Sequence, residues 1–400
     1  MSLNATPTGE RIHIGIFGRR NAGKSSLINA ITGQELAIVS EVRGTTTDPV
    51  SKAMELLPLG PVVLIDTPGI DDEGELGMQR VKKARGVLNK TDIALLVIGG
   101  EEPTKEDIAL LDDIKAKNIP YVVAYNKCDG FAYTERAYAE NEIAVSARDG
   151  IHIKELRELI ARTYRRDEEE RRVIGDLLTE GDTVILVVPI DKAAPKGRLI
   201  LPQQQTIRDI LDANANALVI KENALTSTLA MLDQKPRMVV CDSQVFGRVS
   251  RETPKEIPLT SFSILMARYK GVLAQAVRGV TALERLKDGD KILISEGCTH
   301  HRQCGDIGTV KLPHWITEHT KKKLDFHFTS GGEFPTDVSQ YALVVHCGGC
   351  MLNEREMRYR MRTADGQDIP MTNYGILIAY VHGILHRSVA PFDDIAALLP

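Results

Sequence analysis

The stretch that decides the fold is Gly18-Arg-Arg-Asn-Ala-Gly-Lys-Ser25, which fits the phosphate-loop pattern G-x-x-x-x-G-K-S without exception. It follows the apolar run Ile12–Phe17 and precedes the helical sequence Ser26–Ile31. Glycines in such a loop let backbone N–H groups surround phosphate oxygens, and the amino end of the following helix adds a positive field. We expect Lys24 to reach the β- and γ-phosphates and the Ser25 hydroxyl to bind Mg²⁺. The stretch therefore predicts a nucleoside triphosphate site.

Three further motifs specify the nucleotide. Asp66-Thr-Pro-Gly69 offers a carboxylate for Mg²⁺ and a glycine that can contact the γ-phosphate. In Asn126-Lys-Cys-Asp129 the last carboxylate can accept hydrogen bonds from N1–H and the 2-amino group of guanine, donors that adenine lacks. Ser146-Ala147 would lie behind the base. Four motifs in this order, each after an apolar run, predict a GTP site. Its predicted residues are Gly18, Asn21, Ala22, Gly23, Lys24, Ser25, Ser26, Asp66, Gly69, Asn126, Lys127, Asp129, Ser146 and Ala147.

Short runs of β-branched residues alternate with helical sequence through the first part of the chain. This alternation is typical of βαβ units that form a mostly parallel sheet. The predicted strands are Ile12–Phe17, Val62–Ile65, Ile93–Ile98, Tyr121–Tyr125 and Ile143–Val145. We therefore predict an α/β fold whose first domain, residues 1–170, is a P-loop domain that binds GTP.

The length of 400 residues exceeds one ordinary domain, and two further α/β domains are predicted. Residues 171–262 alternate strands and helices but carry no phosphate loop and no evident catalytic set. A domain of this kind suits association between chains, although the alternation of strands and helices does not by itself establish that role. Its predicted strands are Thr183–Val188, Ala217–Ile220, Met238–Cys241 and Ile257–Thr260, and its predicted helices are Pro202–Asp212 and Ala224–Leu232. Residues 263–400 form the third predicted domain.

The composition excludes several classes of protein. Hydrophobic residues make up 43% and charged residues 26% of the chain, which is ordinary for a globular protein. The net charge of −4 argues against a protein that coats nucleic acid. No charged-then-apolar leader and no apolar run of membrane-spanning length is evident. We therefore expect a soluble, cytoplasmic protein with neither a membrane nor a nucleic acid as its partner.

Four of the six cysteines lie in the last third of the chain, close to histidines. The predicted strand Lys291–Ser295 leads to Cys298-Thr-His300, and Tyr341–Val345 leads to His346-Cys347-Gly-Gly-Cys350. Ligands gather at the carboxyl ends of strands in open α/β sheets. Three thiolates with an exchangeable fourth ligand suit a [4Fe–4S] cluster. A Cys₃His set also suits structural zinc, and the spacing alone does not decide between the two metals.

The first domain resembles the translation-factor-related GTPases of the tRNA-modification and ribosome-assembly type. Gly44-Thr-Thr-Thr-Asp48 is similar to their switch I, which implies an Mg²⁺ contact at Thr46, with the flanking threonines as alternatives. Asn21 matches the residue that coordinates K⁺ in potassium-activated members, although a loop-stabilising role is the alternative. Ile70 stands where Ras-type enzymes place a water-orienting glutamine. An apolar side chain cannot position water, so slow hydrolysis and a timed switch are expected.

The whole chain resembles the HydF family of GTPases that mature [FeFe]-hydrogenase. The family's motif, C-x-H and then H-C-x-x-C, is matched by Cys298-Thr-His300 and His346–Cys350. Three more stretches resemble the family: Leu186–Asp191, Ala194–Ile200 and Ile369–Gly375. The resemblance implies a scaffold or carrier that accepts a diiron precursor from radical-SAM maturases and delivers it to apo-[FeFe]-hydrogenase. It also implies that the middle domain dimerises, with a tetramer as a further possibility.

The resemblance also implies the metal ligands. Cys298, Cys347 and Cys350 would hold a [4Fe–4S] cluster. His300 or His346 is the first candidate for an exchangeable fourth ligand, although both could instead orient ligands from behind. Cys304 is the second candidate, and it would close the site to a precursor. A rival interpretation is an RNA-linked or ribosome-assembly GTPase with a structural zinc site.

Overall fold

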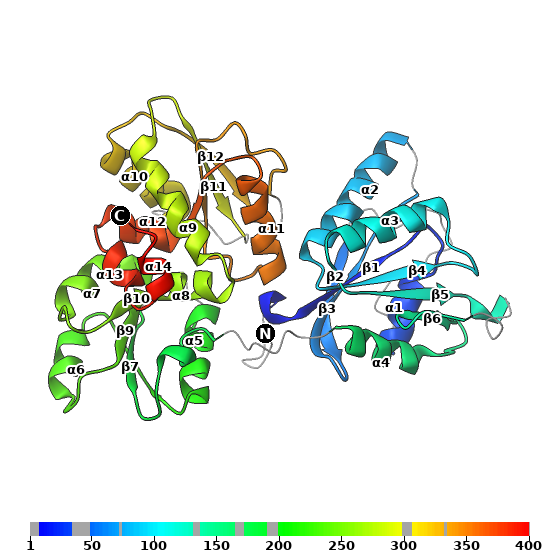
Figure 1. The fold of residues 1–400 in the computed structure, drawn as a ribbon, viewed down its shortest axis with the longest axis horizontal. Coiled ribbons are helices and arrows are strands. Elements are labelled where there is room, and N and C mark those ends of the chain that lie inside the picture. The colour runs from blue at the N-terminus through cyan, green and yellow to red at the C-terminus, as the bar shows by residue number, and fades with distance from the viewer. Residues whose placement is uncertain are drawn as a thin grey trace. The chain divides into compact units, whose positions relative to one another are not determined.

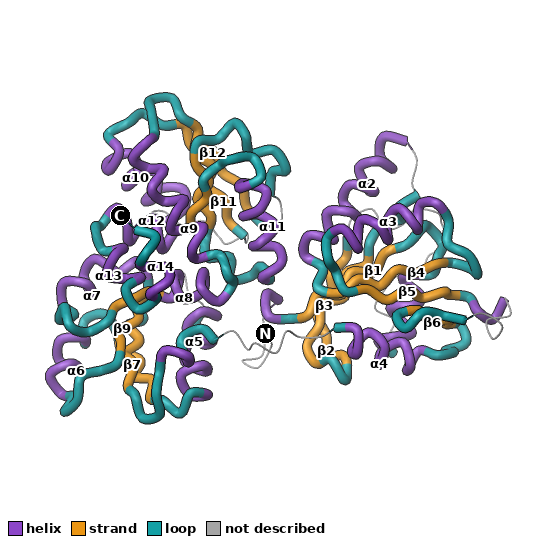
Figure 2. The backbone as a smooth tube through the Cα atoms, viewed as in Figure 1, coloured by secondary structure: helices purple, strands orange, loops and turns teal. Residues whose placement is uncertain are grey.

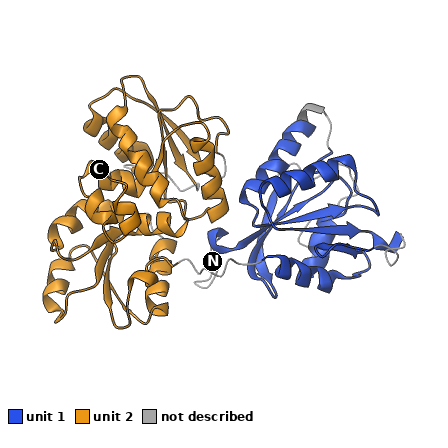
Figure 3. Cartoon of the chain, in the orientation of Figure 1, with its two compact units in different colours: residues 1–169 blue, residues 170–400 orange. Residues whose placement is uncertain are grey.

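The computed structural model describes residues 8–33, 49–71, 74–130, 137–164, 172–189, 199–297, 306–331 and 334–399. The chain divides into two compact units, residues 1–169 and 170–400, which Figure 3 colours separately.

The first unit is built on a six-stranded sheet with the order β2-β3-β1-β4-β5-β6 (Figure 1). Only β2 runs antiparallel to its neighbour, and the other pairings are parallel. The central strands are apolar runs buried on both faces, as parallel sheets require. The strands are β1 (Ile12–Phe17), β2 (Val50–Leu56), β3 (Gly60–Asp66), β4 (Ile93–Ile98), β5 (Tyr121–Asn126) and β6 (Glu142–Val145).

Helices cover both faces of this sheet, as Figure 2 shows. Apolar side chains of α1 and α4 pack on one face, and those of α2 and α3 pack on the other. The helices are α1 (Lys24–Thr32), α2 (Gly74–Val87), α3 (Lys105–Ala116) and α4 (Ile153–Thr163). The predicted α/β fold and its five strands are confirmed.

Strand β2 was not predicted from the sequence. Its residues, VSKAMEL, contain no β-branched run, and all but Met54 and Leu56 are exposed. An edge strand that turns most of its side chains to solvent carries little of the apolar pattern on which strand prediction depends.

The second unit contains two four-stranded parallel sheets, β10-β9-β7-β8 and β12-β11-β13-β14. One continuous hydrophobic core extends over both, from Val173 to Ile395. The strands are β7 (Thr183–Val187), β8 (Asn216–Ile220), β9 (Met238–Cys241), β10 (Leu259–Ser261), β11 (Lys291–Glu296), β12 (Asp325–Ser330), β13 (Leu343–His346) and β14 (Met371–Asn373). Strands β12 and β14 were not predicted, because β12 is a half-exposed edge strand and β14 spans only three residues.

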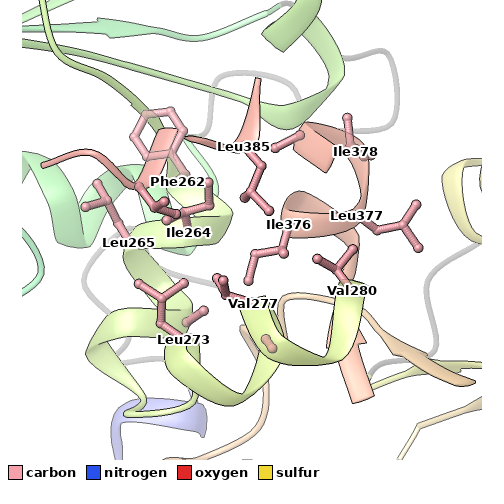
Figure 4. Packing of buried hydrophobic residues seen from close by; sticks show 14 of the residues in the cluster. Phe262, Ile264, Leu265, Leu273, Val277, Val280, Ile376, Leu377, Ile378 and Leu385 are labelled. Atoms are coloured by element: carbon pink, nitrogen blue, oxygen red, sulfur yellow. The ribbon is translucent and has the colours of Figure 1, made fainter. Parts of the chain in front are cut away.

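Helices of the second unit join the two sheets. Figure 4 shows apolar side chains of α8, α9, α12 and α13 gathered in one packed region. Helix α8 ends at Tyr269 because Gly271 adopts a φ of 67°, and α9 begins at Leu273. The helices are α5 (Leu201–Asp212), α6 (Leu225–Met231), α7 (Phe246–Glu252), α8 (Phe262–Tyr269), α9 (Leu273–Val280), α10 (Leu312–Thr320), α11 (Glu354–Asp365), α12 (Tyr374–Val381), α13 (Leu385–Val389) and α14 (Asp393–Ala396).

Within the described ranges, none of the helices combines the length and the apolar character that crossing a bilayer requires.

The tight centre of the first sheet gives a test of this packing. A Cβ added at Gly15 in β1 would lie 2.4 Å from Thr91 Oγ1 and 2.6 Å from the Phe17 ring. We expect Gly15→Ala to lower the free energy of unfolding of the first unit by ~1–3 kcal/mol, because the added methyl group would overpack the core. Gly86→Ala, on an exposed turn of α2 with open space around it, is the matched control. Denaturant unfolding of both variants measures the difference, and equal stabilities would contradict the packing described.

Candidate functional site

The phosphate loop connects β1 to α1 and takes its shape from close backbone contacts. Gly18 has a φ of 147° and Gly23 a φ of 91°. A Cβ at Gly18 would lie 2.3 Å from the carbonyl oxygen of Val97, and one at Gly23 would lie 2.2 Å from Asn126 Nδ2. Only glycine fits either position, so the loop lies directly against the ends of β4 and β5.

Lys24 is buried and holds the loop closed. Its Nζ donates hydrogen bonds to the carbonyl oxygens of Gly18 and Arg19, each at 2.9 Å. Only 8% of the residue is exposed. The ammonium group therefore lies inside the turn that the nucleotide phosphates would occupy, with its position set by backbone oxygens.

Ser25 and Asp66 form the predicted magnesium site. Ser25 Oγ donates a 2.8 Å hydrogen bond to Asp66 Oδ2, while Asp66 Oδ1 is buried and has no hydrogen-bond partner. Burial raises the pKa of Asp66 above its usual range, against the opposing effects of the Ser25 hydrogen bond and the charge of Lys24. A hydroxyl and a carboxylate with an unsatisfied oxygen are the ligands that Mg²⁺ prefers, so these residues fit the ion.

The base-binding motifs are tied to the phosphate loop and to each other. Asn126 Nδ2 donates to the carbonyl oxygen of Ala22 at 2.9 Å, and Asn126 Oδ1 accepts from the backbone N–H of Ala147 at 3.1 Å. Ser146 Oγ donates to Asp129 Oδ1 at 2.8 Å, and this bond is the largest cause of the lowered pKa of Asp129. The carboxylate is thus kept ionised, the state that accepts hydrogen bonds from guanine.

The predicted nucleotide residues within the described ranges lie together at one edge of the sheet. Lys127 also reaches the loop, with Nζ donating to the carbonyl oxygen of Asn21 at 2.8 Å. Gly69 approaches the loop closely, since a Cβ there would lie 2.9 Å from the backbone nitrogen of Arg20. Thr46 lies outside the described residues, as do its two neighbouring threonines.

Two loop contacts were missed by sequence reasoning. Asp71 Oδ1 accepts a 2.6 Å hydrogen bond from the backbone N–H of Arg20. Asp107, buried at the start of α3, accepts from Arg19 Nε at 3.2 Å. The sequence does signal that Asp107 closes a capping box with Thr104. It does not signal that α3 starts beside the phosphate loop.

The second site is the cysteine loop, residues 347–352, which follows β13. Cys347 Sγ accepts hydrogen bonds from the backbone N–H groups of Gly297 at 3.0 Å and Gly349 at 3.4 Å. Gly349 has a φ of 60°, and a Cβ there would lie 2.5 Å from Met357 Sδ. Gly297 immediately precedes Cys298, so the two predicted cysteine groups begin at neighbouring strand ends. Backbone N–H groups that point at sulfur stabilise a thiolate.

Part of the predicted metal site belongs to segments that the structure does not describe. Cys298, His300 and Cys304 lie outside the described residues. Among the described residues no group of three histidine, cysteine or acidic side chains is arranged to hold a metal ion. Burial raises the pKa of the Cys350 thiol, the nearby Cys347 raises it further, and the charge of Lys270 opposes both effects.

His346 is fully buried, and both of its ring nitrogens are hydrogen-bonded. Nε2 lies 2.9 Å from Arg360 Nη1, and Nδ1 lies 2.7 Å from the carbonyl oxygen of Cys347. Because arginine only donates, Nε2 accepts and the ring proton is on Nδ1. Arg360 is itself fully buried and donates from Nε to Glu356 Oε1 at 2.9 Å. Sequence reasoning missed the buried Glu356–Arg360 pair, since Glu-x-x-x-Arg on a helix ordinarily indicates exposed charges.

The stretch Ile369–Gly375 contains β14, which pairs with β13, and it contacts the end of β11 next to Gly297. Asn373 Oδ1 accepts from the backbone N–H of Ile376 and caps α12. Tyr374 donates its hydroxyl to Glu296 Oε1 at 3.2 Å, next to Gly297. Burial, followed by the charge of Glu296, raises the pKa of Tyr374 far above its usual value.

The geometry around Asp129 predicts base selectivity. Asp129→Asn would replace a carboxylate oxygen with an amide NH₂ group, which cannot accept hydrogen bonds from N1–H and the 2-amino group of guanine. We therefore expect GTP affinity to fall at least ~100-fold. Asp149→Asn is the matched control, because Asp149 also accepts from Ser146 Oγ, at 3.3 Å, but lies outside the four motifs. Titration with a fluorescent GTP analogue measures both. Equal losses in the two variants would contradict the assignment of Asp129.

Comparisons with known proteins match three successive parts of the chain. Residues 13–127 match the 50S ribosome-binding GTPase family. Residues 173–271 match the hydrogen maturase F dimerization domain, and residues 274–391 match the hydrogen maturase F tetramerization domain.

Individual relatives share the first part of the chain. GTPase Der of Thermomicrobium roseum is 39% identical over 155 residues, which are 37% of this chain and 33% of that protein. The tRNA modification GTPase MnmE of Legionella pneumophila is 34% identical over 176 residues, 43% of this chain and 36% of that protein. The chain thus spans about a third of the length of these relatives. A solved structure of an Aquifex aeolicus Era variant bound to GDP and AlF₄⁻ is 20% identical, covers 52% of this chain and 93% of that one, and has a TM-score of 0.34.

The two hydrogen maturase F domains follow each other with only residues 272 and 273 between them, and both come after the residues that match a GTPase family. Together they cover more than half of the chain. The chain belongs to the hydrogen maturase F (HydF) family.

Proposed function

We propose that this GTP-binding hydrogenase maturation protein is a scaffold that receives a diiron precursor from radical-SAM maturases and delivers it to apo-[FeFe]-hydrogenase. The observation that carries the proposal is the pairing of a complete set of GTP motifs in one unit with a cysteine loop at a strand edge in the other. The cysteine and histidine motifs of the last domain suit metal binding and offer no direct use for phosphoryl transfer. GTP hydrolysis therefore gates the exchange of partners.

The nucleotide residues divide the work of binding and slow hydrolysis. Lys24 exchanges its two carbonyl oxygens for phosphate oxygens, while Ser25 and Asp66 hold Mg²⁺. Ile70 gives the attacking water no hydrogen-bond partner, so hydrolysis is slow. K⁺ bound beside Asn21 would add positive charge next to the phosphates and stimulate the reaction.

Cys347 and Cys350, together with Cys298, would hold a [4Fe–4S] cluster. Cys347 fits this group, because two backbone N–H groups donate to its Sγ, and hydrogen bonds to sulfur are among the factors that tune such clusters. When bound, the cluster would supply an iron with an exchangeable position for the precursor. The two hydrogen bonds of His346 favour a role in orienting the Cys347 backbone over a role as the fourth ligand.

The dimerization and tetramerization domains indicate that the chain forms oligomers. We propose a homodimer as the basic unit, located in the cytoplasm with both maturases and the apo-hydrogenase. The division into domains 1–170, 171–262 and 263–400 likewise remains a proposal.

Metal analysis of the anaerobically purified chain tests the cluster. We expect about four irons and four sulfides per chain, the composition of a [4Fe–4S] cluster. Cys347→Ser and Cys350→Ser should each lose most of this iron, because a thiolate ligand is removed. Cys241→Ala, which removes a cysteine buried in the other sheet of the same unit, should retain it. Stoichiometric zinc without sulfide in the wild-type chain would instead favour a GTPase with a structural zinc site.

A second experiment tests the gating role of GTP. Lys24→Ala removes the ammonium that the phosphates require, and we expect the variant to keep its iron but to mature apo-hydrogenase at least ~10-fold more slowly. Lys105→Ala, at the exposed start of α3, is the control and should mature it normally. Hydrogenase activity after incubation with the loaded scaffold measures the transfer. Full maturation by Lys24→Ala would remove GTP from the mechanism.

A further inference from the structure

Lys270 is a buried lysine directly behind the cysteine loop. Only 4% of the residue is exposed. Its Nζ donates hydrogen bonds to the carbonyl oxygens of Gly349 and Leu352, the second at 2.9 Å. Removing an ammonium group from water costs several kcal/mol unless hydrogen bonds replace its hydration. The backbone of the cysteine loop provides such bonds.

The backbone of Lys270 is fixed independently of the loop that its side chain reaches. Lys270 is the C-cap of α8, and its N–H donates to the carbonyl oxygen of Met266 at 3.0 Å. Apolar side chains of α8 are packed against α9 and α12, as Figure 4 shows for Ile264, Val277 and Ile376. Movement of the cysteine loop beyond the reach of this anchored side chain would break both bonds to the ammonium.

Lys270 also lies in a different family segment from the loop. Residues 173–271 match the dimerization domain, whereas the cysteine loop lies in the tetramerization domain, residues 274–391. The cavity that Lys270 lines together with His346, Cys347 and Gly348 is only about 10 Å³, too small for any ligand larger than water. Lys270 therefore contacts the loop directly rather than across a ligand pocket.

We propose that Lys270 is a positioning residue of the metal site, which fixes the backbone of the cysteine loop and places a positive charge behind its thiolates. The proposal rests on the proposed function, in which this loop holds a [4Fe–4S] cluster. Three thiolates give such a cluster a negative total charge, and reduction adds one more negative charge. A buried cation nearby favours the reduced state, because net charge is one of the factors that set cluster potentials.

The positioning role is tested on the metal-free, full-length chain by amide hydrogen exchange. Lys270→Met is expected to raise the exchange rate of the peptide that spans 347–352 at least ~10-fold, since local opening no longer breaks two hydrogen bonds. Lys270→Arg, which keeps the charge and the donors, should restore most of the protection. Lys291→Met is the matched control, at the opposite end of β11 from Gly297. Unchanged exchange in the loop, or an equal increase throughout β11 and β13, would overturn the proposal.

The electrostatic role is tested by the reduction potential of the reconstituted cluster. We expect Lys270→Met to bind as much iron as the wild type but to favour the oxidised state about tenfold more, which is a shift of about −59 mV for one electron. Lys270→Gln removes the charge while keeping a hydrogen-bond donor, and it should shift the potential in the same direction. This variant replaces Lys270→Met in the experiment if the Met variant does not fold. An unchanged potential at equal iron content would contradict the proposal. If the wild-type chain binds no iron, the proposed function fails, while the exchange measurement still decides the positioning role.

Discussion

The carboxyl ends of parallel strands are the constraint on which both candidate sites depend. Backbone groups there have no further strand to pair with, so loops at this edge direct N–H groups and side chains towards a ligand. In the first unit, β1, β3, β5 and β6 lead into the phosphate loop, Asp66, Asn126 and Ser146. In the second unit, β11 and β13 lead to Gly297 and Cys347. The two units apply the same geometry to two candidate sites, one predicted to bind phosphate and the other proposed to bind a metal through sulfur.

Each site also contains a buried ammonium group held by backbone carbonyl oxygens. Lys24 donates to oxygens of the phosphate loop, and Lys270 donates to oxygens of the cysteine loop. A phosphate anion can replace the carbonyl partners of Lys24, because they belong to the loop that binds it. The partners of Lys270 are the carbonyl oxygens of Gly349 and Leu352, in the backbone of the cysteine loop. In our proposals the first lysine exchanges partners when phosphate binds, whereas the second fixes the backbone of its loop.

The parts predicted from sequence were those encoded in short contiguous stretches. The phosphate loop, the motif that ends in Asp129 and the apolar central strands each carry their signal within a few residues. Strand β2 was missed because its exposed side chains lack an apolar pattern. Arg360 and Lys270 were missed because a charged residue indicates an exposed face unless its distant partner is known. Contacts between residues far apart in the sequence, such as Arg19 with Asp107, become visible only in the fold.

The two sheets of the second unit share one hydrophobic core. Helix α13, near the end of the chain, packs against β10, and α12 packs against α8. The family segments that meet near residue 272 are therefore separate in sequence but not in packing. A recombination event at that boundary would join two halves of a core that had evolved with different partners. Inheritance of this unit should consequently proceed as a whole, with compensating changes on both sides of the boundary.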